Sequence, residues 1–292
     1  MTALQTNMSR ILIAEDSASQ AVQIQDLLES AGHDVVVVSD GIQAVSELEK
    51  NQTDVLVTDL MMPNMDGCEL TRVVVDRFPH VPVVVITARG SESLAVDALA
   101  DGAVNFIPKA LLHNRLVGLL TEIADRVKID QQTDGCGAKV LVPELVFSLH
   151  SQISAIEPVA QYVQRTLAFT GALDIVSRLR VTSAVASALL NAICYGNLGM
   201  VDNEEAVCKL IRGEEAAETE HKVRLVVSVG PQDLRFSVAH DGPGKITRTN
   251  PAPGTPQSFE LEDCRGVLLI TSIMDTVNYD WSRREIIMAK DI

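Results

Sequence analysis

The sequence has 292 residues, more than one typical domain, and 47% of them are hydrophobic, which is enough to form buried cores. The formal net charge is −15: residues 1–130 carry 9 basic and 19 acidic side chains, and residues 131–292 carry 15 and 20. We therefore expect no DNA-binding domain, because binding to phosphates requires clustered Lys and Arg.

The cysteines and the N-terminus indicate the cellular compartment. Five scattered cysteines without a C-x-x-C pair, and a start that lacks the apolar segment of a signal peptide, predict reduced thiols in a cytoplasmic protein. Residues 181–201 carry no charge and are long enough to suggest a membrane span. They include Asn191 and Asn197, which favour a buried helix over one that faces lipid, so we expect no membrane segment.

Short apolar segments alternate with amphipathic ones through residues 8–130. The apolar segments span 10–14, 35–38, 54–58, 83–87 and 103–107, and helical spacing covers 17–31, 42–50, a stretch ending at 78, 91–100 and 111–128. Strands with hardly a polar residue are buried on both faces, as in a parallel sheet covered by helices. This part of the chain is predicted to be a doubly wound α/β domain with a five-stranded parallel sheet.

Polar residues follow these predicted strands. Glu15 and Asp16 come after the first strand, Asp59 after the third, Thr87 ends the fourth, and Lys109 follows the fifth. The carboxyl ends of parallel strands gather ligands, and three carboxylates there would repel each other without a cation such as Mg²⁺. Lys109 adds a fixed positive charge and Thr87 a hydroxyl, so the set is suited to stabilising a transferring phosphoryl group.

Four motifs in residues 8–130 resemble those of response regulator receiver domains, which have a flavodoxin-like fold. They are E-D at 15–16, D-L-M-M-P-N-M-D-G at 59–67, I-T-A at 86–88 and F-I-P-K at 106–109. The resemblance implies that Asp59 accepts a phosphoryl group from a histidine kinase or phosphotransfer protein. In one departure, Pro108 precedes the lysine and Ala110 follows it, whereas the family has its proline after the lysine.

The same resemblance implies the roles of the other receiver residues. Thr87 and Phe106 are the expected switch pair, and Lys109 is expected to supply the positively charged side chain of the site. The implied Mg²⁺ ligands are Asp16, Asp59 and the backbone carbonyl of Met61, with Glu15 acting directly or through water.

Residues 131–139 are polar and contain glycine, so they are predicted to be a linker to a second domain over 140–292. In that domain we expect strands at 144–150, 222–229, 234–239, 277–281 and 285–289. Helices are expected at 153–169, 175–195 and 267–275, with a short helix within 203–220 and a long loop at 242–263. Hairpins and segregated helices predict an α+β two-layer sandwich.

Three segments of the second domain resemble the histidine kinase-like ATPase fold, most closely its anti-sigma-factor serine kinases. They are S-A-L-L-N-A-I-C-Y-G-N at 187–197, A-H-D-G-P-G at 239–244 and C-R-G-V-L-L-I at 264–270. The resemblance implies an ATP site in which Asn191 ligates the Mg²⁺ of ATP and His240 occupies the position of an adenine-reading Asp. Gly242, Gly244 and Gly266 would let the backbone approach the nucleotide.

The departures from this pattern predict that kinase activity has been lost. Ser187 stands where the family has its Glu general base, and it cannot take a proton at neutral pH. His240 cannot mimic a carboxylate, Asp241 lies one residue too late to replace it, and Cys264 stands where a glycine is usual. A purely structural interpretation stays open, in which Asn191 cross-links buried backbone and residues 241–244 form only a turn.

Three functions are compatible with the sequence. In the first, phosphorylation of Asp59 controls a protein-binding output whose partner, by family analogy, is a sigma-factor regulator. In the second, the chain is a receiver-gated protein serine kinase that uses ATP. In the third, the second domain is a dimerisation module that forms a homodimer.

Overall fold

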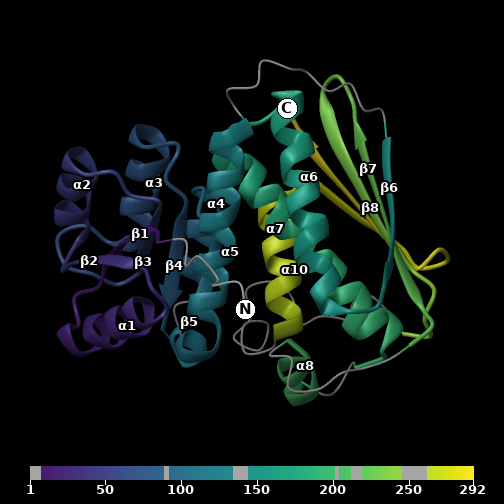
Figure 1. Cartoon of the computed structure of the whole chain (residues 1–292), viewed down its shortest axis with the longest axis horizontal. Helices are drawn as coiled ribbons and strands as arrows, with labels where there is room; N and C mark the ends of the chain where they lie inside the picture. Colours follow the sequence, from purple (N-terminus) through teal and green to yellow (C-terminus); the bar gives the residue numbers. More distant parts are fainter. Residues whose placement is uncertain (1–7, 89–91, 134–143, 201–203, 212–218, 245–261) are drawn as a thin grey trace, which may run out of the picture. The chain divides into compact units, whose positions relative to one another are not determined.

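The computed structural model describes residues 8–88, 92–133, 144–200, 204–211, 219–244 and 262–292. The chain forms two compact units, with the main boundary between residues 135 and 136, and each unit has its own five-stranded sheet (Figure 1). The first sheet is parallel and the second antiparallel, so the predicted pair of fold classes is confirmed.

The sheet of the first unit has the strand order β2-β1-β3-β4-β5. Its strands are β1 (Arg10–Ala14), β2 (Asp34–Val38), β3 (Val55–Asp59), β4 (Val83–Thr87) and β5 (Asn105–Pro108). Every residue of β3 and β4 is buried. This is the burial expected for central strands covered on both faces, and it places their carboxyl ends at the middle of one sheet edge.

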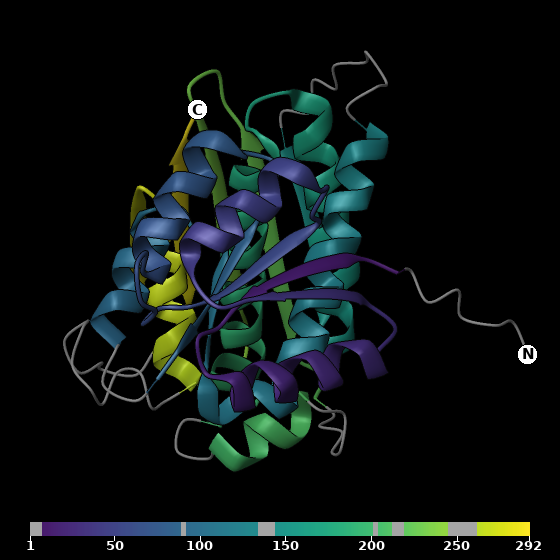
Figure 2. The ribbon, with the colours of Figure 1, turned by 90° about the vertical axis from the view of Figure 1, so that its left-hand side faces the viewer.

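Helices cover both faces of this sheet. They are α1 (Ala18–Ser30), α2 (Gly41–Lys50), α3 (Gly67–Arg77), α4 (Glu92–Ala100), the 3-10 turn η1 (Lys109–Leu111) and α5 (Leu112–Thr133). Helix α1 contacts α5, and α3 contacts both α2 and α4, so the two groups lie on opposite faces (Figure 2). Helix α5 continues to Thr133, which moves the first three residues of the predicted linker into the helix, and residues 134–139 lie outside the described part.

The sheet of the second unit has the strand order β6-β7-β8-β10-β9. Its strands are β6 (Glu144–His150), β7 (Lys222–Val229), β8 (Asp233–His240), β9 (Thr276–Asp280) and β10 (Glu285–Asp291). Val223, Leu225 and Val227 of β7 are buried and alternate with more exposed residues. This period of two gives the sheet one apolar face.

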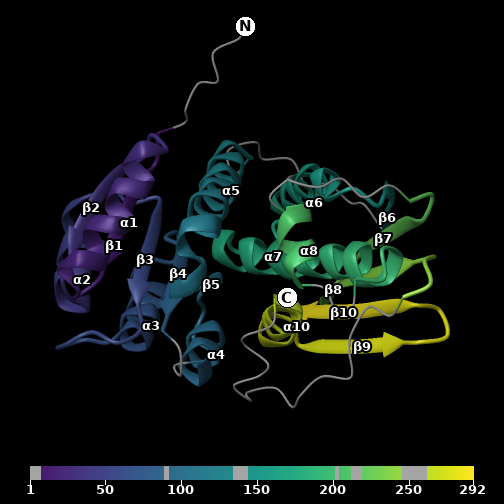
Figure 3. The same ribbon diagram turned by 90° about the horizontal axis from the view of Figure 1, so that it is seen from below.

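Helices pack on that apolar face (Figure 3). They are the 3-10 turn η2 (Ile153–Ala155), α6 (Ile156–Thr170), α7 (Ile175–Asn191), the π-helical turn η3 (Ala192–Asn197) and α10 (Glu262–Ile273). A further helix, α8 (Glu204–Ile211), packs through Val207 against η3. Gly171 ends α6 in the left-handed conformation (φ 64°), as its position in the sequence predicts.

One helix of this unit begins well before its predicted position. Helix α10 begins at Glu262, five residues before the predicted start at 267, because acidic residues such as those of the E-D sequence are favoured in the first turn of a helix. The remainder of the predicted long loop, 245–261, lies outside the described residues. The segment Ile175–Asn197 is long and apolar enough to cross a membrane. Within its most apolar stretch, 78% is buried against the rest of the protein, as predicted for a buried helix.

Candidate functional site

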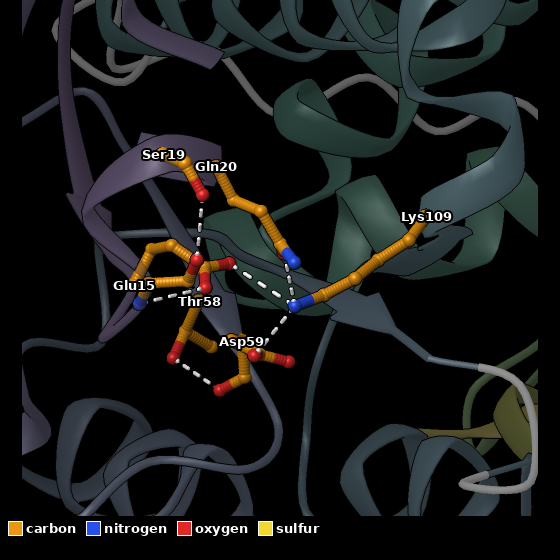
Figure 4. A network of polar contacts seen from close by, with 7 residues as sticks. Glu15, Ser19, Gln20, Thr58, Asp59 and Lys109 are labelled. Atoms are coloured by element: carbon orange, nitrogen blue, oxygen red, sulfur yellow. Dashed lines mark hydrogen bonds and ion pairs between the residues drawn. The ribbon is translucent and has the colours of Figure 1, made fainter. Parts of the chain in front are cut away.

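The acidic residues predicted to meet at the sheet edge of the first unit do so, and Figure 4 shows Glu15 and Asp59 among them. Glu15 and Asp16 directly follow β1, and Asp59 is the last residue of β3. One carboxylate oxygen from each of the three lies within 4.8 Å of the others. Three hard oxygen donors at this spacing fit a divalent cation such as Mg²⁺, which would supply positive charge to offset their repulsion.

Lys109, which directly follows β5, contacts two carboxylates of this cluster. Its Nζ donates hydrogen bonds to Asp59 Oδ2 at 2.8 Å, to Glu15 Oε2 at 3.3 Å and to Gln20 Oε1 at 2.5 Å. Glu15 is only 2% exposed and Asp59 only 4%. Two carboxylates at this depth are strongly destabilising unless they are paired, so the Lys109 ammonium makes the arrangement possible.

The environment shifts the ionisation of both partners. Burial raises the pKa of Glu15, the neighbouring charge of Asp59 raises it further, and Lys109 opposes both effects. Burial alone would lower the pKa of Lys109, but the hydrogen bond and charge of Asp59, together with Glu15, raise it above its ordinary value. Lys109 therefore stays positively charged, but its charge does not fully offset the effect of burial on the pKa of Glu15.

The loop after β3 is fixed by a close backbone approach. An ideal Cβ on Gly67 would lie 2.2 Å from the carbonyl oxygen of Asp59, so only glycine fits there. The Gly67 amide donates to the Leu60 carbonyl at 3.0 Å, and the Asp66 side chain caps α3 by accepting from the Glu69 amide at 2.8 Å. The D-G pair at 66–67 thus holds the helix start against the Asp59 backbone.

The remaining predicted receiver residues lie near the same edge. Thr87 ends β4 and is 4% exposed, and Phe106 is buried on the neighbouring strand β5. The Met61 side chain is 60% exposed, as expected for a loop residue. The switch role of Thr87 and Phe106 and the ligand role of the Met61 carbonyl stay predictions. Gln20 was missed, because one glutamine on an exposed helical stretch gives no distinctive signal.

In the second unit, the five predicted nucleotide positions meet around the end of α7. Asn191 is the last residue of α7, and an ideal Cβ on Gly266 would lie 3.3 Å from its Oδ1. The Gly244 amide donates to the Gly196 carbonyl at 2.8 Å. The Gly242 amide donates to Asn197 Oδ1, also at 2.8 Å. The loop with Gly242 and Gly244 thus lies against the π-helical turn η3, whereas Gly266 lies within α10 beside Asn191.

His240 completes this group at the end of β8. Its side chain packs over Gly196, where an ideal Cβ would lie 2.6 Å from the His240 Cγ. The residue is 5% exposed, and neither ring nitrogen has a hydrogen-bond partner among the described residues. Burial, with a further contribution from the Arg284 charge, lowers the pKa of His240 to about 4. The ring is therefore neutral at pH 7 and offers no carboxylate-like charge.

Asp241 does not take over the carboxylate role. Its Oδ1 accepts from the Lys222 amide at 2.7 Å and lies 3.3 Å from His221 Nδ1, at the start of β7. Ser187, on α7, cannot act as a general base at neutral pH. Cys264 falls in the first turn of α10, and its side chain is outside the described part. Among the described residues, Ser187 and His240 thus do not supply the carboxylates that the fold resemblance implies for an ATP site.

Three further residues, not assigned from the sequence, hold this loop in place. Asn197 Nδ2 donates to Ser151 Oγ at 2.7 Å, and Ser151 Oγ donates to the His221 carbonyl at 2.8 Å. Arg284 Nη1 donates to the carbonyl oxygens of Asp241 at 3.0 Å and of Gly242 at 2.6 Å. Asn197 ends the Y-G-N segment of the motif at 187–197, which was the only available signal for its role.

Comparisons with known families agree with the two units. Residues 11–121 match the response regulator receiver domain family, and residues 149–290 match the histidine kinase-like ATPase domain family. The chain is a receiver domain followed by a histidine kinase-like ATPase domain. This receiver relates the chain to the response regulators of two-component signalling.

The similar curated proteins are themselves response regulators. Response regulator MprA of Mycobacterium sp. (strain KMS) is 30% identical over 125 residues, which cover 43% of this chain and 54% of MprA. Response regulator protein FleR of Pseudomonas aeruginosa is 30% identical over 116 residues, 40% of this chain and 24% of FleR. The chain thus spans about half of MprA and less of FleR.

A solved receiver domain from Clostridium thermocellum is 27% identical and covers 42% of this chain and 98% of that structure, with a TM-score of 0.40.

Proposed function

We propose that this chain is a response regulator in which phosphorylation of Asp59 controls a protein-binding output domain. The observation that carries the proposal is the contrast in charge between its two sites. Asp59, Glu15 and Asp16 form an acidic cluster balanced by Lys109, whereas the ATPase-like site has neutral Ser187 and His240 at its key positions. The upstream partner is a histidine kinase or a phosphotransfer protein.

In the proposed reaction, a carboxylate oxygen of Asp59 attacks the phosphorus of the donor. The bond from phosphorus to the donor atom breaks, and an acyl phosphate forms on Asp59. The Lys109 ammonium, already 2.8 Å from Asp59 Oδ2, is placed to neutralise charge on the transferring phosphoryl oxygens. Mg²⁺ held by Glu15, Asp16, Asp59 and the Met61 carbonyl would supply further positive charge at this site.

The signal would leave the site through Thr87 and Phe106. Thr87 lies at the end of β4, where its hydroxyl can donate to a phosphoryl oxygen, and Phe106 packs on the adjacent strand. Both residues are almost fully buried on adjacent strands, so we propose that they rearrange together. A new local charge thereby biases a two-state packing arrangement on the β4–β5 face.

For the output, we propose a protein partner rather than DNA or a membrane. The acidic composition opposes DNA binding, and the resemblance to anti-sigma-factor kinases suggests a sigma-factor regulator as the partner. The neutral His240 and the absence of a carboxylate at Ser187 support an output domain that has lost kinase activity. The setting would be the cytoplasm.

The experiment compares full-length wild type with Asp59→Asn after incubation with acetyl phosphate and Mg²⁺. Intact-mass spectrometry should detect one added phosphoryl group on the wild type and none on Asp59→Asn. Asp26→Asn, an exposed aspartate on α1, is the matched control and should be labelled like the wild type. Equal labelling of Asp59→Asn and wild type would rule out Asp59 as the acceptor.

A second candidate function, a receiver-gated serine kinase, is favoured by one observation. Asn191 is buried next to Gly266, and the Gly242 and Gly244 amides still hold the loop against η3, so part of an ATP-site framework remains. Calorimetric titration of the full chain with ATP and Mg²⁺ decides between the two functions. We expect no binding at millimolar nucleotide; tight binding would favour the kinase.

A further inference from the structure

The first helix of the receiver contributes a side chain to the Asp59 site that the family motifs do not include. Gln20 lies in the first turn of α1, and its Oε1 accepts a hydrogen bond from Lys109 Nζ at 2.5 Å (Figure 4). Gln20 and Lys109 also line one hollow between α1 and the start of α5. Gln20 therefore contacts the cation of the site rather than the carboxylates.

The geometry of the Lys109 ammonium explains why this contact matters. An ammonium has three N–H donors, and here the three acceptors come from three different segments. Asp59 belongs to β3, Glu15 follows β1, and Gln20 belongs to α1. A lysine side chain has many rotamers, so three divergent hydrogen bonds fix the position of Nζ far better than two.

The three acceptors differ in what phosphorylation does to them. Asp59 loses its negative charge to the acyl phosphate, and Glu15 is shared with the proposed cation site. Gln20 is neutral, so its hydrogen bond to Lys109 does not compete electrostatically with an incoming phosphoryl oxygen. It is the one neutral acceptor of the three, and it takes no part in the proposed cation site.

We propose that Gln20 is a positioning residue for phosphoryl transfer at Asp59, acting by holding the Lys109 ammonium in place. The inference rests on the proposed function of Asp59. With acetyl phosphate as donor, the acetate–phosphorus bond breaks, the Asp59–phosphorus bond forms and acetate leaves. Hydrolysis then transfers the phosphoryl group from Asp59 to water. The same ammonium faces the phosphoryl oxygens in both steps, so a displaced Lys109 slows both.

The first test measures both rates in the full chain carrying Gln20→Met, which keeps the length of the side chain but removes the acceptor. Mass spectrometry follows labelling by acetyl phosphate with Mg²⁺, and then loss of the label after the donor is removed. We expect both rate constants to fall about fivefold, the size expected for the loss of one typical intramolecular hydrogen bond. Gln23→Met, an exposed glutamine three residues further along α1, should leave both unchanged.

A double-mutant cycle separates positioning from a general structural effect. If Gln20 acts through Lys109, Gln20→Met should have no further effect on either rate in a Lys109→Met background. An undiminished fivefold effect in that background would overturn the proposal. So would a slower hydrolysis with unchanged labelling, since that pattern belongs to a residue that orients water.

The proposal and the function on which it rests fail in different ways. If wild type is labelled on Asp59 and Gln20→Met is labelled equally fast, the role of Gln20 is wrong while the function of Asp59 stands. If wild type takes no label, both are wrong.

Discussion

The Asp59 site and the η3 site use buried polar groups in opposite ways. At the Asp59 site, Lys109 pairs with two buried carboxylates, and three acidic residues still have oxygens clustered within 4.8 Å. At the η3 site, the Asn197 amide binds Ser151 and the Gly242 backbone, and His240 is neutral. The first arrangement leaves charge for a ligand, whereas in the second Asn197 holds its own loop and His240 carries no charge.

Under the proposed function, a retained backbone motif does not by itself retain chemistry. Glycines at both sites still allow the close approaches that their motifs require, Gly67 beside Asp59 and Gly244 beside Tyr195. Among the described residues, the receiver site also has the charged side chains that we propose to act on a phosphoryl group. Function follows the side-chain set and not the loop geometry alone.

The largest expected effect comes from removing the cation at the Asp59 site. Lys109→Met should slow labelling of Asp59 by acetyl phosphate by about 10²–10³-fold, the cost of removing one preorganised electrostatic donor. Lys50→Met, which loses only a surface contact to Ser46, should be labelled at the wild-type rate. If Lys109→Met were labelled as fast as wild type, the charge of Lys109 would not explain the difference between the two sites.

The next effect tests whether both sites depend on their glycines. An ideal Cβ on Gly244 would lie 1.8 Å from the Tyr195 carbonyl oxygen, so the backbone must shift in Gly244→Ala. We expect the second unit to lose about 3 kcal/mol of unfolding free energy. Urea unfolding followed by the fluorescence of Trp281, the only tryptophan, reports on this unit. Pro243→Ala, an exposed neighbour, should cost less than about 1 kcal/mol.

The receiver offers the matching variant. Gly67→Ala forces the Asp59 carbonyl to move, so it should slow labelling of Asp59 and leave the Trp281 transition unchanged. Changes in the reverse pattern would mean that the two glycines do not act locally.

A third prediction concerns the neutral His240. Its folded pKa of about 4 lies below the ordinary value of 6.5, so the unfolded state binds a proton more readily. The second unit should therefore keep its full stability above pH 6.5 and lose it as the pH falls towards 4, by at most about 3 kcal/mol. Trp281-monitored urea unfolding at several pH values measures this slope.

The control for this prediction replaces His240 itself and, in a separate variant, the nearby His221. Arg284, Asp241 and His221 all act on His240 through their charges. His240→Leu should flatten the slope, whereas His221→Gln should leave most of it. A slope that survives His240→Leu would mean that another group causes the pH dependence.

The smallest effect tests the internal bonding of the η3 site. Ser151→Ala removes the hydroxyl that links Asn197 to the His221 carbonyl, and leaves a buried amide without that partner. We expect a loss of about 1–3 kcal/mol in the second unit. Ser154→Ala, in the exposed part of η2, should be neutral within about 0.5 kcal/mol.

Much of the fold could be predicted because the strands have strong local signals. The largely apolar run at 83–87 and the alternating run at 222–229 became β4 and β7 with the predicted bounds. The start of α10 was placed too late, because E-D-C-R has no apolar periodicity and its helical preference comes from charge at the helix end. The end of α5 was placed too early, because its last residues are polar.

The site was predictable to the extent that its residues come from dense motifs. Glu15, Asp16, Asp59 and Lys109 follow strands whose carboxyl ends must meet, so topology alone brings them together. Gln20 could not be predicted, since its contact with Lys109 depends on the angle between α1 and the end of β5. The direction of Asp241 likewise depends on an amide of β7, which is distant in the sequence.

The most direct test of the account gives the full chain Mg²⁺ together with either acetyl phosphate or ATP, in separate experiments. We predict that acetyl phosphate adds one phosphoryl group, that peptide mapping places it on Asp59, and that calorimetry with ATP detects no binding at millimolar nucleotide. ATP binding at micromolar concentration, or a label from acetyl phosphate that persists in Asp59→Asn, would contradict the contrast between the two sites.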